Sequence, residues 1–186
     1  LGSGGFGTVF LAQYQNMAVA VKEPHNAASI HKDEYRKRAF CREADHLYRL
    51  RHPNIVNFVG AIVEDEHHEP CYCIVTEVLP FTLEAYLTAK ATSSISVGQQ
   101  VIFDLATGLS YMHASKIIHR DIKPQNVMVD ELGRAKYIDF GLSKEEELSR
   151  QTSASYTMVG TQSWMAPEVK KGEKATAASD VYSLGM

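Results

Sequence analysis

The stretch HRDIKPQN, residues 119–126, places ionisable side chains and a carboxamide between two apolar runs. The flanks are Ile117–Ile118 and Val127–Val129. A buried strand would not tolerate so many polar groups, and a surface loop would not need such flanks. The pattern therefore predicts a polar loop that short buried strands hold in place. Its candidate functional side chains are His119, Arg120, Asp121, Lys123 and Asn126.

Composition limits the class of protein. The chain has 186 residues, 45% of them hydrophobic, which is enough for one domain or two small lobes. A net charge of −3 does not favour a nucleic-acid partner. Three cysteines do not suggest a disulfide framework, so we expect a reducing, cytoplasmic setting. No apolar run approaches the roughly 20 residues of a membrane span, and because residue 1 is Leu we expect the true start to be missing.

The pattern of apolar residues predicts a β-rich front and a helical back. Strands are expected in residues 1–22, at Ile55–Val63 and Cys71–Val78, and in short pieces at 117–118, 127–129 and 135–138. A helix is expected over 31–50, a short one over 82–89 and a longer one over 96–113. The expected apolar face of the first helix is formed by Phe40, Ala44, Leu47 and Tyr48. That of the long helix is formed by Val97, Val101, Ile102, Leu105, Leu109 and Met112.

The stretch GSGGFG, residues 2–7, fits the pattern G-x-G-x-x-G, which by itself is a weak signal. A dinucleotide-binding fold would have a helix after these glycines and an acidic residue about 20 positions on. Here a strand follows, and Lys22 stands after Val19–Val21. A glycine-rich hairpin remains the alternative, but a charge within an apolar strand needs a partner. Glu43 on the following helix can supply one, although a solvent-exposed helix face explains Glu43 equally well.

These segments, in this order, make the chain resemble a eukaryotic protein kinase domain. The glycine loop, Lys22 and Glu43 are followed by HPNIV (52–56), HRDIKPQN, Asp139–Gly141 and Ala166–Glu168. The stretch 179–185 resembles the start of the family's large central helix. The resemblance covers essentially all 186 residues, and seven segments in the right order are far more specific than any one of them.

The resemblance implies an α+β, bilobed fold with ATP in a cleft. The expected parts are a β-rich N-lobe over 1–76 with the start of its first strand missing, a hinge over 77–82, and a partial helical C-lobe over 83–186. This C-lobe is expected to be truncated in the central helix. The implied activity is transfer of the ATP γ-phosphate to protein hydroxyls.

The resemblance also assigns catalytic roles. Asp121 is the expected base for the substrate hydroxyl, and Lys123 is expected to reach the transferring phosphate. Asn126 and Asp139 are expected to hold Mg²⁺, and their oxygens are donors that this ion prefers. His119 is expected to pack against Phe140 rather than act as a base.

The remaining expected ATP-binding residues come from the loop, the strands and the hinge. Thr76 is expected to guard the back of the adenine pocket, with backbone bonds to adenine from Glu77 and Leu79. The glycine loop and apolar side chains complete the set, which is Leu1, Gly2, Gly4, Gly7, Val9, Ala20, Lys22, Glu43 and Met128.

Phosphorylation is the expected regulation. The regulatory candidates are Arg120, Thr157 and Thr161. Arg120 precedes Asp121, and Thr157 lies four residues before Thr161 in an activation segment spanning 139–168. We predict that phosphorylated Thr157 pairs with Arg120. The alternative is a polar loop without a regulatory role.

Lys123 and Gly160–Thr161 resemble serine/threonine kinases, and the stretch 164–168 resembles the tyrosine-kinase-like group. We therefore expect Ser/Thr protein substrates, with dual specificity open. The alternatives are a kinase-fold scaffold without activity, a small-molecule kinase, and a zinc site at His67, His68, Cys71 and Cys73. The strand pattern explains these cysteines without a metal.

Overall fold

The structure is a computed structural model that describes residues 1–4, 7–25, 30, 32–90, 95–145 and 161–186. It forms two compact units. One contains Leu1–Arg51 and Val56–Val78, and the other contains His52–Ile55 and Leu79–Met186. The α+β class predicted from the sequence is confirmed, whereas the lobe boundaries near residues 76 and 82 stay predictions.

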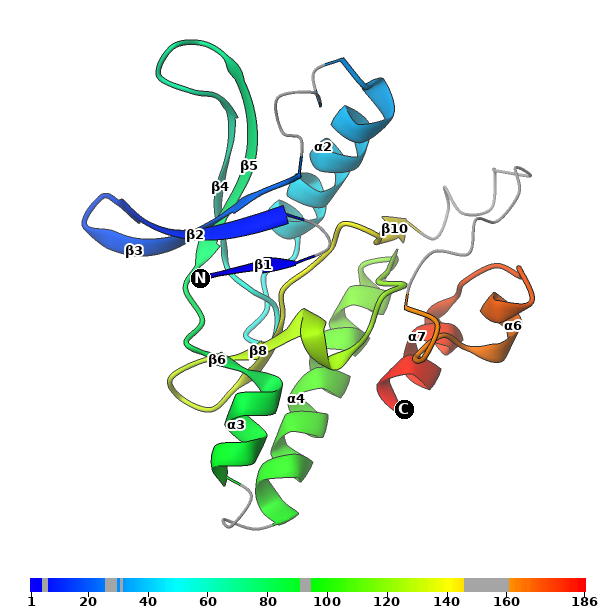
Figure 1. The fold of residues 1–186 in the computed structure, drawn as a ribbon. Helices are drawn as coiled ribbons and strands as arrows, with labels where there is room; N and C mark the ends of the chain where they lie inside the picture. The colour runs from blue at the N-terminus through cyan, green and yellow to red at the C-terminus, as the bar shows by residue number, and fades with distance from the viewer. Residues whose placement is uncertain (5–6, 26–29, 31, 91–94, 146–160) are drawn as a thin grey trace. The chain divides into compact units, whose positions relative to one another are not determined.

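The first unit is built on a five-stranded antiparallel sheet with the order β1-β2-β3-β5-β4. Its strands are β1 (Gly2–Gly4), β2 (Gly7–Tyr14), β3 (Met17–Glu23), β4 (Phe58–Glu64) and β5 (Pro70–Glu77). The long β2–β3 and β4–β5 hairpins are visible in Figure 1. This order places β3, which carries Lys22, directly beside β5.

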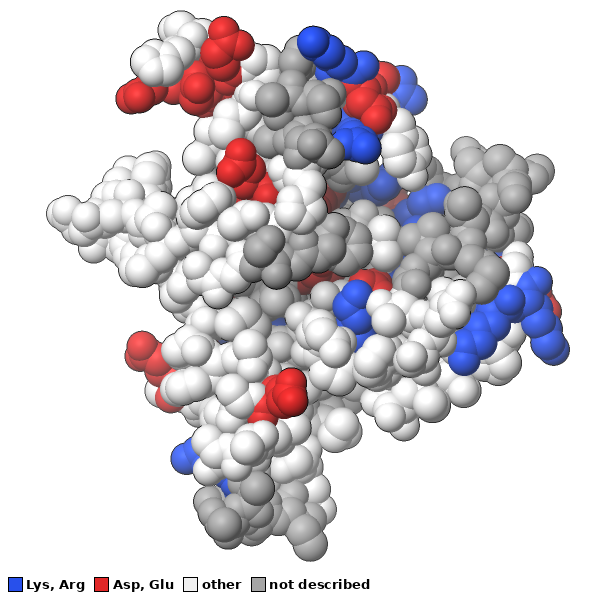
Figure 2. Space-filling model, in the orientation of Figure 1, with Lys and Arg blue, Asp and Glu red and all other residues white. Residues whose placement is uncertain are grey.

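The β2–β3 hairpin carries no charged residue between Gly7 and Val21, and its surface in Figure 2 is correspondingly uncoloured. Gly7 at its start has φ +148°, and a Cβ atom there would lie 2.1 Å from the Glu23 carbonyl oxygen. Only glycine permits this close approach of β2 to the end of β3. The last glycine of the 2–7 loop is therefore required by backbone packing.

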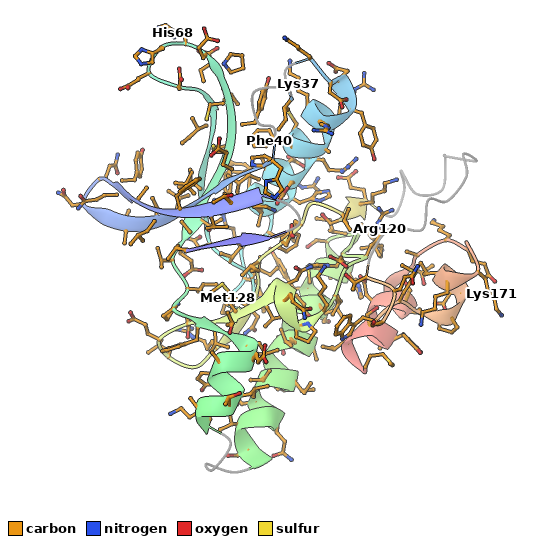
Figure 3. All side chains as sticks on the ribbon, viewed as in Figure 1. Lys37, Phe40, His68, Arg120, Met128 and Lys171 are labelled. Atoms are coloured by element: carbon orange, nitrogen blue, oxygen red, sulfur yellow. The ribbon has the colours of Figure 1, made fainter. Side chains whose placement is uncertain are left out.

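One helix, α2 (Glu34–Arg49), packs against this sheet. Asp33 caps it, because its carboxylate accepts hydrogen bonds from the backbone N–H groups of Tyr35 and Arg36. Phe40 meets Tyr72 of β5 edge to face, with ring centroids 5.3 Å apart. Figure 3 labels Phe40 on the helix. This contact fixes which side of α2 faces the sheet.

The second unit holds two small sheets and most of the helices. Its strands are β6 (Phe81–Thr82), β7 (Ile117–Ile118), β8 (Val127–Val129), β9 (Ala135–Tyr137) and β10 (Lys144–Glu145). The sheets have the orders β6-β8-β9 and β10-β7. The helices are α3 (Leu83–Lys90), α4 (Ile95–Ala114), the 3-10 turn η1 (Pro124–Asn126), α6 (Pro167–Lys170) and α7 (Ala177–Leu184). Residues 119–126 thus lie between β7 and β8, as the apolar flanks predict.

Helix α4 supplies the core of this unit. Val101, Leu105, Leu109 and Met112 recur on one face and are each at most 4% exposed. The helix packs on β9, where the Tyr137 hydroxyl donates to the Leu105 carbonyl. The candidate residues of the 119–126 loop are therefore supported by a packed core.

Three details of the predicted elements are wrong. Tyr48 and Ile102 were expected on buried helix faces, yet they are 65% and 53% exposed. The 3.6-residue period of a helix does not determine whether residues at the edge of an apolar stripe are buried. Tyr48 and Ile102 lie on the exposed side of that edge. The strand expected from Ile55 begins only at Phe58, because the Ile55 N–H donates to the His52 carbonyl in a turn.

Candidate active site

Lys22 and Glu43 form an ion pair, which is one of the two alternatives that the sequence left open for Glu43. The Lys22 Nζ lies 2.8 Å from the Glu43 Oε1, and the two side chains are 22% and 13% exposed. Lys22 lies opposite Val9 of β2 and Ile74 of β5, so two neighbouring strands fix its backbone. The partly buried carboxylate keeps the ammonium in one place, where it can meet an anion.

The remaining nucleotide-site candidates of the first unit lie along the same strands. Gly2 and Gly4 belong to β1 and Gly7 begins β2, while residues 5–6 of the loop lie outside the described part of the chain. Ala20 pairs with Thr76 across β3 and β5. Leu1 is 69% exposed, and its amino group donates to the Val9 carbonyl. Glu77 ends β5, and its carboxylate accepts the Asn57 N–H at 2.7 Å.

In the second unit, Asp121 is the centre of a polar cluster. It is 5% exposed, and its Oδ2 lies 2.7 Å from the Lys123 Nζ and 2.9 Å from the Asn126 Nδ2. Its Oδ1 accepts hydrogen bonds of 3.0 Å from both the N–H and the hydroxyl of Thr161. Lys123 also donates to the Thr161 hydroxyl at 2.8 Å. Both carboxylate oxygens are therefore held, so the group is preorganised.

Asn126 and Asp139 fit a magnesium ion by the chemistry of their donors. The Asn126 Nδ2 donates to both the backbone carbonyl and the carboxylate of Asp121. That leaves its Oδ1, a hard oxygen donor, for a cation. The Ile138 N–H donates to the Asn126 carbonyl. Asp139 follows Ile138 in the sequence, so this hydrogen bond brings the backbone next to Asp139 close to Asn126. The Asp139 Oδ1 in turn accepts the Gly141 N–H at 3.1 Å.

His119 has the packing role that the resemblance predicted. It is fully buried, and its ring centroid lies 5.2 Å from that of Phe140. Burial lowers the pKa of His119 below its ordinary value of 6.5, with the nearby Asp180 carboxylate opposing the shift. Its Nδ1 accepts the Asp121 N–H at 3.3 Å, and its Nε2 has no hydrogen-bond partner among the described residues. The Asp121 N–H occupies the Nδ1 of His119 and the ring packs on Phe140, so His119 orients the loop.

Asp180 on α7 holds the backbone of the 119–126 loop through hydrogen bonds. Its carboxylate accepts the backbone N–H groups of His119 and Arg120, each at 2.8 Å, and lies 2.9 Å from the His113 Nε2. Arg120 has φ +70°, an uncommon conformation for a residue with a side chain. Its Nε donates to the Leu142 carbonyl at 2.8 Å, and Figure 3 labels this residue. Fixed hydrogen bonds thus stabilise a strained backbone at this position.

Two remaining adenine-site candidates also belong to the second unit. Leu79 is 7% exposed, and Met128 lies on β8 opposite Thr82, as labelled in Figure 3. Thr157 lies outside the described residues. Among the residues that are described, no three His, Cys, Asp or Glu side chains lie so that they could hold a metal ion.

Sequence reasoning missed two contacts. Thr161 was proposed as regulatory, but both of its polar groups contact the Asp121 carboxylate, a pairing separated by 40 positions in the chain. His113 was not singled out, because a histidine at the end of an amphipathic helix carries no distinctive spacing. Its contact with Asp180 spans 67 positions and is decided by tertiary packing.

Comparison with known proteins decides the family. The model of the protein kinase domain matches residues 1–186. The chain belongs to the protein kinase domain family. The kinase domain is 37% identical, over its whole length, to a probable serine/threonine-protein kinase of Dictyostelium discoideum, of which it covers 35%. It is 36% identical over its whole length to the mitogen-activated protein kinase kinase kinase dlk-1 of Caenorhabditis briggsae, of which it covers 20%.

A plant relative is equally similar. The kinase domain, over 99% of its length, is 36% identical to the serine/threonine/tyrosine-protein kinase HT1 of Arabidopsis thaliana. It covers 46% of that protein, so the chain spans less than half the length of these relatives. None of the helices in the described ranges is long and apolar enough to cross a bilayer.

Proposed function

We propose that the chain transfers the γ-phosphate of ATP to serine and threonine hydroxyls of protein substrates. The observation that carries the proposal is the buried Asp121 carboxylate, whose two oxygens are held by Lys123, Asn126 and Thr161. A positioned carboxylate beside a positioned ammonium is what phosphoryl transfer to an alcohol requires. The relatives named serine/threonine kinases support the same activity.

In this proposal Asp121 orients the substrate hydroxyl and accepts its proton as the oxygen attacks phosphorus. Lys123 neutralises negative charge on the transferring phosphate, and the Thr161 hydroxyl holds Lys123 and Asp121 in register. The 3.0 Å and 2.8 Å contacts of Thr161 support this positioning role.

ATP and Mg²⁺ are the proposed cofactors, as the family implies. Asn126 and Asp139 are the residues that would hold the cation, which supplies charge neutralisation at the phosphates. In the first unit, Lys22, held by Glu43 at 2.8 Å, is the proposed phosphate contact. The glycine loop, Val9, Ala20, Thr76 and Glu77 are the proposed nucleotide contacts of that unit, with Leu79 and Met128 those of the second.

Replacement of Asp121 by asparagine tests the proposal. We expect the rate of transfer from ATP to a generic basic protein to fall by about 100-fold to 10,000-fold, since a general base contributes about that much. Binding of Mg²⁺–ATP should change little. The matched control, Asp45→Asn, changes an exposed carboxylate on α2 and should leave the rate unchanged. An unmodified chain that binds ATP yet transfers nothing would overturn the proposal and favour a scaffold role.

We also propose that phosphorylation of Thr157 regulates the domain through Arg120. The support is the spacing to Thr161 and the position of Arg120, whose backbone is held by Asp180 next to the catalytic carboxylate. Thr157→Ala should lower the activity of a chain treated with an activating kinase. Equal activities for the two treated chains would exclude this regulation.

The three free cysteines support a cytoplasmic location, which we propose as well.

A further inference from the structure

Two cysteines of β5 form a close pair that the phosphotransfer machinery does not use. The Sγ atoms of Cys71 and Cys73 lie 3.4 Å apart. Tyr72 between them packs on Phe40 of α2, so strand alternation directs the two thiols to the opposite face of the sheet. Cys73 is 4% exposed, whereas Cys71 is half-buried and can be reached from solvent.

A disulfide is a poor fit to this pair. Residues two apart on an extended strand have Cα atoms about 6.6 Å apart, at the upper limit for a disulfide. The sulfurs would also have to close from 3.4 Å to about 2.05 Å. On the β4 side Cys73 pairs with Ile62 and the register shifts between Cys73 and Pro70, while the pairing of β5 with β3 ends at Ile74. We therefore describe the pair as two thiols and do not expect a disulfide between them.

A single atom bound to both sulfurs fits the spacing much better. With metal–sulfur bonds of about 2.3 Å, a 3.4 Å separation corresponds to a sulfur–centre–sulfur angle of about 95°. A tetrahedral centre would require about 3.8 Å between the sulfurs, and a linear one about 4.6 Å. Trivalent arsenic, which carries a lone pair, bonds at angles slightly above a right angle. It also needs only two sulfurs, and the described part of the chain offers no three-ligand group here.

We propose that Cys71 and Cys73 form a binding site for trivalent organoarsenicals. Cys71, the accessible thiol, reacts first, and Cys73 then closes the ring. In water the arsenical reacts as its hydrated form, with two hydroxyls on arsenic. Each sulfur forms one arsenic–sulfur bond as one arsenic–oxygen bond breaks, and each S–H proton leaves with that hydroxyl as water. Arsenic stays trivalent and both sulfurs stay at the thiolate level, so no oxidant or reductant is needed.

The surroundings favour attack through the neutral thiol. Burial raises the pKa of Cys73 to about 12, and contact with the Cys71 sulfur and the charge of Glu23 act in the same direction. Condensation with an arsenic hydroxyl consumes the thiol proton, so this protonated state is compatible with the reaction. It also makes Cys73 a weak nucleophile toward alkylating reagents and peroxides, which act on thiolates.

Phenylarsine oxide is the probe that tests the site. We expect intact-protein mass spectrometry to show one phenylarsenic group per chain, and free thiols to fall from three to one, leaving Cys41. Cys71→Ser and Cys73→Ser should each weaken binding by about 100-fold or more, because the second bond is intramolecular. Cys41→Ser is the matched control and should leave the affinity unchanged.

A peptide of residues 70–75 separates a folded site from the sequence alone. The folded chain should bind the probe at least ten times more tightly than this peptide, since β5 holds the sulfurs at the required distance. Equal affinities of chain and peptide would overturn the proposal, as would loss of the Cys41 thiol or unaltered binding by either serine variant. These readouts do not depend on phosphate transfer.

Discussion

Replacing Asp180 by alanine tests whether one buried carboxylate holds the 119–126 loop. Asp180 is 1% exposed, and it accepts the backbone N–H groups of His119 and Arg120. Alanine leaves the buried N–H of His119 and the half-buried N–H of Arg120 without this acceptor. An orphaned buried donor costs about 1–3 kcal/mol and a half-buried one less, so we expect the free energy of unfolding to fall by about 2–4 kcal/mol. That is a large share of the 5–15 kcal/mol typical of a domain.

Two further variants should lower the free energy of unfolding by smaller amounts than Asp180→Ala. Asp180→Asn keeps one acceptor oxygen, so it should cost about half as much as alanine. His113→Ala removes the third contact of Asp180, but His113 is 16% exposed and water can replace it. We expect a loss below about 1 kcal/mol for this variant. The order of the three losses distinguishes orphaned backbone groups from a simple loss of packing.

Urea unfolding at pH 7, followed through the fluorescence of Trp164 and by circular dichroism, measures these losses. Asp45→Ala provides the control, because Asp45 forms an exposed pair with Arg49 that should contribute below about 0.5 kcal/mol. If Asp180→Ala lost no more stability than Asp45→Ala, the carboxylate would not be holding the loop.

Three other substitutions test the site. Lys22→Met removes the 2.8 Å pair with Glu43 and should lower kcat/KM for ATP by about 100-fold, which steady-state kinetics would measure; an unchanged value would contradict it. Asn126→Ala removes two contacts to Asp121 and should lower kcat by about 100-fold while raising the Mg²⁺ concentration needed for half-maximal rate. An identical Mg²⁺ dependence would exclude a cation contact. Burial lowers the pKa of His119, so the unfolded chain binds more protons and stability should fall as the pH drops below about 6.5. His119→Phe should flatten that fall in urea titrations, and parallel curves would refute the reasoning.

The segments of the candidate site were readable without coordinates, because chemistry concentrated in short stretches leaves a local signature. Residues 119–126 stand between two apolar runs, and these became β7 and β8. Lys22 in an apolar strand indicated a need for a partner, and Glu43 supplies it across 21 positions. In each case, a polar group in apolar surroundings predicted that something must compensate it.

The sequence alone determined the class of fold, the order of its elements and the side chains capable of the chemistry, since periodicity and polar–apolar contrast are local properties. Only the tertiary structure decided which groups share a hydrogen bond. The contacts of Thr161 with Asp121 and of His113 with Asp180 follow from packing. Such contacts depend on distances that are set when distant segments fold together, and no spacing along the chain encodes them.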